Sequence, residues 1–176
     1  MPRIVNQIKE ALALFAALSH PPALIGGLAL AAHRVPRATQ DIDFLVDSDD
    51  ADMLHELLLE HGYRCRHRSE DAANYLRGDE GLDVLYAHRP TARQLLAAAQ
   101  SRDTALGRMR VISAEGLIGF KLQAIVNDPK RVQDVQDIRA LLRANSKTLN
   151  MDEVREYFRL FEREALFNEL VAELDQ

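Results

Sequence analysis

Apolar residues recur at helical spacing near the start of the chain. Over residues 2–19 they lie three or four positions apart, as on one face of an amphipathic helix: Ile4, Val5, Ile8, Leu12, Phe15 and Leu18. The pair Pro21-Pro22 predicts where this helix stops, because proline cannot continue a helical hydrogen-bond ladder. We therefore expect a first helix over residues 2–19.

Short apolar runs then alternate with glycine and proline stops. The pattern predicts a buried strand, a short helix and a second strand, over residues 23–26, residues 28–33 and from Asp41 on. Ser48 fits the N-cap of the next helix, and Gly62 fits its C-terminal stop. Thr91 and Gln94 have the spacing of a capping box, which predicts a helix to about Arg102.

The remaining segments complete the picture of mixed strands and helices. Further strands are expected over residues 63–69, 74–77, 82–87 and 109–112, and further helices begin after Ser113, after Pro129 and after Asn150. We predict an α/β (α+β) fold, with a small mixed β-sheet flanked by helices and a helical C-terminal part. The core is expected over residues 1–146, with residues 147–176 as a helical extension of the same domain.

Composition narrows the class of protein. With 176 residues, 47% of them apolar, the chain can bury the core of one domain. A net charge of −5 argues against a protein that tracks long nucleic acid. The single Cys65 cannot form an internal disulfide, and the sequence has neither an apolar leader nor a run of transmembrane length. We expect a cytoplasmic protein without membrane contact.

Candidate chemistry lies between residues 23 and 47. Gly26 and Gly27 fall at a strand-to-helix junction, where backbone amides can approach a phosphate closely. Asp41 and Asp43 share one face of the following strand, about 6.6 Å apart along the chain. Two carboxylates at this spacing can hold Mg²⁺ ions that bridge phosphate oxygens, as phosphoryl or nucleotidyl transfer requires.

The order Gly26-Gly27, then Asp41-Ile42-Asp43, resembles the signature of the DNA polymerase beta-like nucleotidyltransferase superfamily. Within it, Arg37-x-Thr39-x-Asp41-x-Asp43 with a downstream Lys and Asp is similar to the minimal nucleotidyltransferases of abortive-infection, type IV toxin systems. The resemblance covers about residues 20–145. It implies an ATP- or other triphosphate-binding, toxin-like enzyme with two Mg²⁺ ions, an RNA end or a protein side chain as acceptor, and an antitoxin protein as partner.

A third carboxylate completes the metal site or acts as general base in many superfamily members. Asp83 is the candidate, because it interrupts an apolar strand where an acid is costly without partners. The alternative is an edge-strand acid that faces water.

Helical periodicity nominates two residues in the second half of the chain. Lys121 lies on the border of an apolar stripe, and Asp134 lies beside a core face formed by Val132, Val135, Ile138 and Leu142, with Asp137 further out. The resemblance implies that these are the family's downstream Lys and Asp, with Lys121 meeting the triphosphate. The alternative is an ion pair between helices.

Basic residues suggest two further contacts. Arg37, with Thr39 in the same loop, could clamp phosphate oxygens. Arg64, Arg66 and Arg68 would share one strand face and could receive a polyanionic acceptor, although such a run is often a solvated surface.

The sequence therefore predicts a Mg²⁺-dependent nucleotidyltransferase, with two alternatives. One is a catalytically silent nucleotide-binding or protein-interaction module, which two departures from the family pattern favour, Gly27 and Gln133. The other is a transferase acting on a small molecule such as an aminoglycoside, for which an acidic acceptor pocket would be expected.

Overall fold

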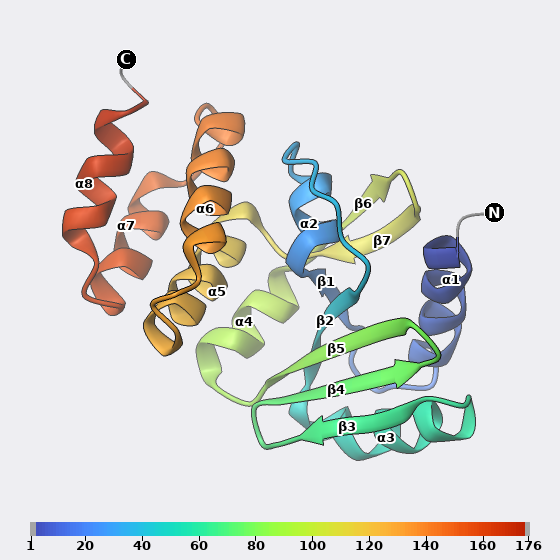
Figure 1. Cartoon of the computed structure of the whole chain (residues 1–176). Helices are drawn as coiled ribbons and strands as arrows, with labels where there is room; N and C mark the ends of the chain where they lie inside the picture. Colours follow the sequence, from blue (N-terminus) through green and yellow to red (C-terminus); the bar gives the residue numbers. More distant parts are fainter. Residues whose placement is uncertain (1–2, 175–176) are drawn as a thin grey trace. The chain divides into compact units, whose positions relative to one another are not determined.

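The protein combines a β-sheet with flanking helices (Figure 1). The computed structural model describes residues 3–174, so residue 2, the expected start of the first helix, lies outside the described part. The strands are β1 (Ala23–Ile25), β2 (Ile42–Asp47), β3 (Arg64–Arg68), β4 (Ala72–Arg77), β5 (Glu80–Ala87), β6 (Gln100–Thr104) and β7 (Gly107–Val111). The helices are α1 (Arg3–Phe15), α2 (Gly26–Ala32), α3 (Ala51–Glu60), α4 (Pro90–Ala98), α5 (Ala114–Asn127), α6 (Val132–Asn145), α7 (Met151–Leu160) and α8 (Glu164–Ala172), with a 3₁₀ turn η1 (Ser48–Asp50).

The strands form one seven-stranded mixed sheet in the order β3-β4-β5-β2-β1-β7-β6. The pairs β2–β5 and β1–β7 are parallel, and the other pairs are antiparallel. This arrangement confirms the predicted fold class. It also places β2, with its aspartates, between β5 and β1.

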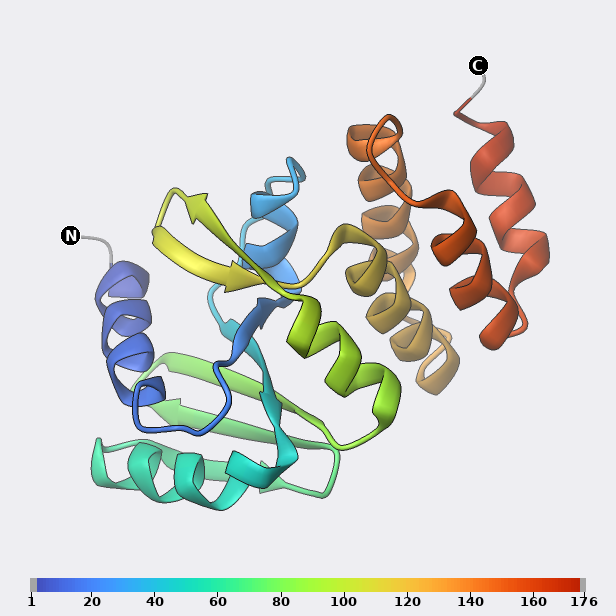
Figure 2. The same cartoon turned by 180° about the vertical axis from the view of Figure 1, so that it is seen from behind.

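One face of the sheet is covered by α1 and α3. Alternation along β2 turns Ile42, Phe44 and Val46 to this face, where each is at most 1% exposed. The Phe15 ring of α1 meets the Phe44 ring edge-on at 4.7 Å. Figure 2, seen from behind, shows α3 in front of β3. Burying such an aromatic side chain contributes about 2–3 kcal/mol, so this face anchors the strand that carries the acids.

The chain forms two compact units. The first contains residues up to Ala29 together with Arg37–Ile112, and therefore the whole sheet. The second contains Leu30–Pro36 and the helices from Ser113 on. In this second unit Asn145 Nδ2 of α6 donates to the carbonyl oxygen of His33 at 3.0 Å, which ties the two segments together. The expected boundary between a core over 1–146 and an extension over 147–176 stays a prediction.

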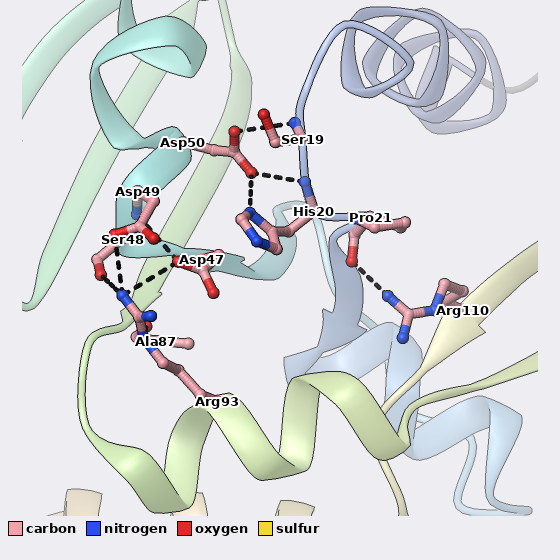
Figure 3. Close-up of polar contacts among 10 residues, drawn as sticks. All are labelled: Ser19, His20, Pro21, Asp47, Ser48, Asp49, Asp50, Ala87, Arg93 and Arg110. Atoms are coloured by element: carbon pink, nitrogen blue, oxygen red, sulfur yellow. Dashed lines mark hydrogen bonds and ion pairs between the residues drawn. The ribbon is translucent and has the colours of Figure 1, made fainter.

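A polar network fixes the end of β2 (Figure 3). The Asp50 carboxylate accepts hydrogen bonds from the backbone N–H of Ser19 at 2.9 Å and of His20 at 2.8 Å, and lies 3.0 Å from His20 Nδ1. Burial alone would raise the pKa of Asp50, but these hydrogen bonds outweigh burial and lower the pKa. Arg93 of α4 pairs with Asp49 at 2.9 Å. The network therefore joins the segment before β1, the end of β2 and α4.

Several expected element boundaries were wrong. Asp47, not Ser48, accepts from the Asp49 N–H and caps η1, because the chain makes a 3₁₀ turn before α3 begins. The Thr91 and Gln94 capping box does not form, because Pro90 already occupies the first turn of α4 with Arg89 as its N-cap. That helix ends at Ala98, well before Arg102. The following residues form edge strand β6, whose polar sequence has no apolar alternation to reveal it.

Other predicted signals were confirmed. Ser113 caps α5 by accepting from the Gly116 N–H, and Asn150 caps α7 by accepting from the Glu153 N–H. Gly62 follows α3 and has a φ of +84°, a left-handed conformation that glycine adopts without strain.

The predicted end of the first helix was wrong, because the helix ends at Phe15 rather than near residue 19.

Candidate functional site

Two of the predicted acids lie side by side in the sheet. Asp43 on β2 and Asp83 on β5 are Cα partners across the parallel pair, so their side chains leave the same face of the sheet. Asp41 directly precedes β2, which begins at Ile42. The neighbouring Ile42 and Phe44 point to the opposite, helix-covered face. Strand alternation and register together thus bring carboxylates that are about forty residues apart in sequence to one region.

Glycines at the turn between β1 and α2 make room for the side chains of this region. A Cβ atom added to Gly26 would lie 2.2 Å from Asp43 Oδ2, and Gly26 also has a φ of +65°. A Cβ atom on Gly27 would lie 2.9 Å from the Cβ of Thr39. Both distances are too short for any larger residue without displacement. The Gly26-Gly27 pair is therefore required for close packing of Asp43 and Thr39, independently of any ligand.

Two residues of the site were not found from the sequence. A Cβ atom on Gly81 would lie 2.0 Å from Asp41 Oδ1, so Gly81 lets that carboxylate rest against the start of β5. Asn74 on β4 is the Cα partner of Asp83, and its Nδ2 donates to Asp83 Oδ1 at 2.8 Å. A glycine inside a strand often marks a close approach, and this signal was available for Gly81. No local pattern pointed to Asn74.

The electrostatics of Asp83 reflect its surroundings. Burial raises the pKa of the Asp83 carboxyl, and the negative charge of Asp41 raises it further, whereas the hydrogen bond from Asn74 acts in the opposite direction. The net effect is a pKa above the ordinary value. Asp41 and Asp83 therefore interact, and a cation between them would relieve this repulsion.

A cavity of about 410 Å³ opens beside these acids. Its lining includes Asp41 and Asp83 on one side and Arg66 and His67 on the other, together with Asn74, Tyr75, Leu76 and Gly81. A volume of this size is in the usual range for small-ligand pockets. The cavity thus carries acidic and basic side chains together.

The basic run on β3 does not share one face, contrary to the prediction. A bulge between Cys65 and His67 breaks the alternation of β3 against β4. As a result, Arg68 lies on the face covered by α3, where its guanidinium pairs with Asp52 at 2.5 Å. Arg66 and His67 instead line the cavity.

The donor set suits a hard cation. Within residues 3–174, no group of three or more His, Cys, Asp or Glu side chains is arranged to hold a metal ion. However, Mg²⁺ is commonly held by only one or two carboxylates, with substrate phosphates and water completing its shell. Asp41 and Asp43 with their glycine-made space fit that requirement, and Mg²⁺ binding stays a prediction.

Lys121 and Asp134 lie in the second unit, in a buried ion cluster. Lys121 Nζ lies 2.8 Å from Asp134 Oδ1 and 2.6 Å from Asp137 Oδ2. Asp134 also pairs with Arg131 at 2.5 Å; burial would raise the pKa of Asp134, but Arg131 and Lys121 outweigh it and lower the pKa. The cluster joins α5 to α6. Contact of Lys121 with a triphosphate stays a prediction.

The expected faces of α6 need two corrections. Val132 is 66% exposed and does not belong to the core, because the helix begins at this residue and its first turn is open to solvent. Asp137 does not lie further out than Asp134: both residues are 3% exposed, since Lys121 reaches between them.

The loop before β2 carries two predicted phosphate-binding residues. Thr39 Oγ1 donates to the carbonyl oxygen of Asp41 at 3.1 Å, whereas Arg37 is exposed.

Solved structures identify the class of this fold. The antibiotic-resistance factor ANT(2″)-Ia, in complex with adenylyl-2″-tobramycin, is similar over 92% of this chain and 98% of its own, with a TM-score of 0.65 and 20% identity. A nucleotidyltransferase-like protein from Paracoccidioides brasiliensis is similar over 96% and 92% of the two chains, with a TM-score of 0.58 and 17% identity. For the lincomycin-bound lincosamide adenylyltransferase LnuA the shares are 77% and 94%, with a TM-score of 0.56 and 15% identity. The fold is that of the DNA polymerase beta-like nucleotidyltransferases.

The family follows from the sequence profile. The chain belongs to a family described as uncharacterised nucleotidyltransferases, whose profile matches residues 3–170. No curated protein matches the chain in sequence. In the described part of the chain, no helix combines the length and the apolar character needed to cross a membrane.

Proposed function

We propose that the protein transfers a nucleoside monophosphate from a nucleoside triphosphate to an acceptor hydroxyl in a Mg²⁺-dependent reaction. The observation that carries this proposal is the grouping of three acids: Asp41 and Asp83 line one cavity, and Asp43 is the Cα partner of Asp83 and lies against Gly26. The nucleotidyltransferase family and fold support the same class of reaction. In this reaction the acceptor oxygen bonds to the α-phosphorus, the bond to the leaving oxygen breaks, and pyrophosphate is released.

The residues of the first unit would have separate roles in metal binding, proton transfer and phosphate binding. Asp41 and Asp43 would hold Mg²⁺, which when bound neutralises phosphate charge and orients the triphosphate. Asn74 occupies Asp83 Oδ1, so Asp83 would offer Oδ2, either to complete the metal site or to accept the proton of the attacking hydroxyl. Backbone amides of Gly26 and Gly27, with Arg37 and Thr39, would bind the phosphates of ATP or another triphosphate.

The residues of the second unit have a more limited part in the proposal. Lys121 is proposed to meet the triphosphate, although its ammonium group is held by Asp134 and Asp137 in this structure. A triphosphate would have to compete with two carboxylates for it. Asp134 would then keep Lys121 charged and oriented.

The acceptor is proposed from the ligands of proteins with a similar fold and from the resemblance to toxin enzymes. ANT(2″)-Ia is seen with an adenylylated aminoglycoside and LnuA with lincomycin, so small molecules are acceptors to test. The resemblance to toxin enzymes suggests an RNA end, such as that of a tRNA, or a protein side-chain hydroxyl. A toxin role and an antitoxin partner belong to the same proposal.

Calorimetric titration tests the proposal directly. Each triphosphate is titrated with and without Mg²⁺ into the wild type and into Asp41→Ala with Asp43→Ala. A matched control, Glu56→Ala with Asp103→Ala, removes two exposed acids of the first unit and changes the net charge equally. We expect Mg²⁺-dependent binding that the site variant loses and the control keeps. Absence of binding by the wild type to every triphosphate would contradict the proposal and favour a catalytically silent module.

A further inference from the structure

We infer that Arg66 and His67 form an acceptor subsite that selects an acceptor whose hydroxyl group lies next to a phosphate. The inference rests on the proposed function and names the acceptor class and the residues that select it. It is carried by the β3 bulge, by the charges that line the 410 Å³ cavity and by the order of strands in the sheet.

The bulge determines which side chains face the acids. Cys65 is the Cα partner of Tyr75 and His67 is the Cα partner of Asn74, so β3 advances two residues while β4 advances one. His67 therefore leaves the sheet on the same side as Asn74 and, through it, Asp83. Without the bulge, His67 would alternate with Arg66 and point to the face covered by α3. Bulges commonly re-aim side chains beside active sites, and here the bulge turns two basic residues to one cavity.

The charges in the cavity are available to a ligand. Among residues 3–174, the side chains of Arg66 and His67 have no ion pair and no hydrogen bond, and both residues are exposed. The adjacent Arg68 differs, because Asp52 neutralises it on the other face. Asp41 and Asp83 line the same cavity as Arg66 without forming a salt bridge to it. Acidic and basic side chains that share a cavity without pairing can bind a ligand complex that carries both positive and negative charges.

Strand order assigns the basic side to the acceptor. The strands run β3-β4-β5-β2-β1, so Arg66 and His67 on β3 flank the acids on one side and the Gly26-Gly27 turn after β1 flanks them on the other. In the proposed function the donor phosphates lie at that turn. Nucleotidyl transfer places the attacking and leaving oxygens roughly in line on opposite sides of phosphorus. An anion on the β3 side therefore belongs to the acceptor.

The chemistry of the subsite indicates phosphate. A guanidinium can donate two parallel hydrogen bonds to phosphate oxygens, and a neighbouring imidazole can donate a third. A polycation such as an aminoglycoside would meet the like charge of Arg66. A hydroxyl next to a phosphate occurs both in a free sugar phosphate and at an RNA end, and the two sources can be separated by experiment.

The test measures acceptor binding by three probes, with and without Mg²⁺ and saturating triphosphate. Ribose 5-phosphate and tobramycin are followed by calorimetry, and a 5′-fluorescein hexaribonucleotide with a free 3′ hydroxyl is followed by anisotropy. The variants are Arg66→Ala and His67→Ala. Arg102→Ala, which removes an exposed arginine from edge strand β6, is the matched control.

We expect the wild type to bind at least one of the two phosphate probes. Arg66→Ala should weaken that binding about tenfold and lower its salt dependence, whereas Arg102→Ala should leave it within about twofold. Binding of ribose 5-phosphate would identify a small acceptor, and binding of the oligoribonucleotide alone would identify an RNA end.

Three results would overturn the inference: binding of neither phosphate probe, binding that Arg66→Ala leaves unchanged, or binding of tobramycin alone. Donor binding separates this failure from failure of the proposed function. If Arg66→Ala and the wild type bind Mg²⁺-triphosphate equally but the acceptor results fail, only the acceptor subsite is wrong. If the wild type binds no triphosphate, the proposed function itself is wrong.

Discussion

Replacing Gly81 by alanine should impair the site without removing any of its functional groups. The new Cβ would lie 2.0 Å from Asp41 Oδ1 and 2.7 Å from its Cγ, whereas ordinary contact begins at 3.4 Å. The carboxylate oxygen must therefore move from 2.0 to at least 3.4 Å, a displacement of about 1.4 Å. Because misplacing a reacting or ligating group by about 1 Å can cost about 100-fold in rate, we expect a loss of about 10- to 100-fold in Mg²⁺-dependent triphosphate binding or turnover.

Stability should not fall with function in this variant. Gly81 does not have a left-handed φ, so alanine can adopt its backbone conformation. Asp41 is exposed and precedes β2, so its side chain can swing into solvent at little cost. Replacing glycine by alanine at a compatible position even stabilises by about 0.4–1 kcal/mol, because the unfolded chain loses freedom. Urea denaturation should therefore give an unfolding free energy equal to or above that of the wild type.

A double-mutant cycle with Asp41→Ala provides the control. If Gly81 acts through Asp41, adding Gly81→Ala to Asp41→Ala should cause no further loss of metal-dependent binding in calorimetry. Fully additive losses would refute this explanation, as would a fall in unfolding free energy large enough to account for the loss of binding.

Three further predictions concern charged groups. Asp50 has a lowered folded-state pKa, so its stabilisation is present above its unfolded pKa of about 3.9 and is lost as pH falls through the lower folded value. Asp50→Asn should lower the unfolding free energy at pH 7 by about 1–3 kcal/mol and weaken its dependence on pH in the acid range, as measured by urea denaturation. An unchanged pH dependence in the acid range would contradict this. Lys121→Met should destabilise by about 3–5 kcal/mol in chemical denaturation because it leaves Asp134 and Asp137 buried without their shared cation, whereas the more exposed Arg131→Met should cost under about 1 kcal/mol; equal effects would contradict the reasoning. Asp83 has a raised folded-state pKa, so the stability linked to its protonated form is present below the unfolded pKa and is lost as pH rises through the folded pKa. Asp83→Asn should therefore raise the melting temperature at pH 7 while weakening Mg²⁺-triphosphate binding. A lower melting temperature would count against this prediction.

Local patterns in the sequence determined much of the framework. Alternation on a strand is a property of the backbone alone, so the burial of Ile42 and Phe44 on the face opposite Asp43 is a local consequence of the sequence. Capping is equally local, and Ser113 and Asn150 cap their helices as expected. The class of fold followed from the succession of such elements.

Tertiary structure decided which of these residues meet. Asp83 adjoins Asp43 because β2 and β5 pair in parallel at that register, and only the same pairing brings in Asn74 and lays Asp41 against Gly81. The β3 bulge separated Arg68 from Arg66 because it arises from pairing with β4 and not from the sequence of β3 alone. Edge strand β6 likewise exists through its partner β7. Strand neighbours and registers are set by non-local burial and hydrogen bonding, so the sequence determined which residues could serve the site and the folded sheet determined which of them lie together.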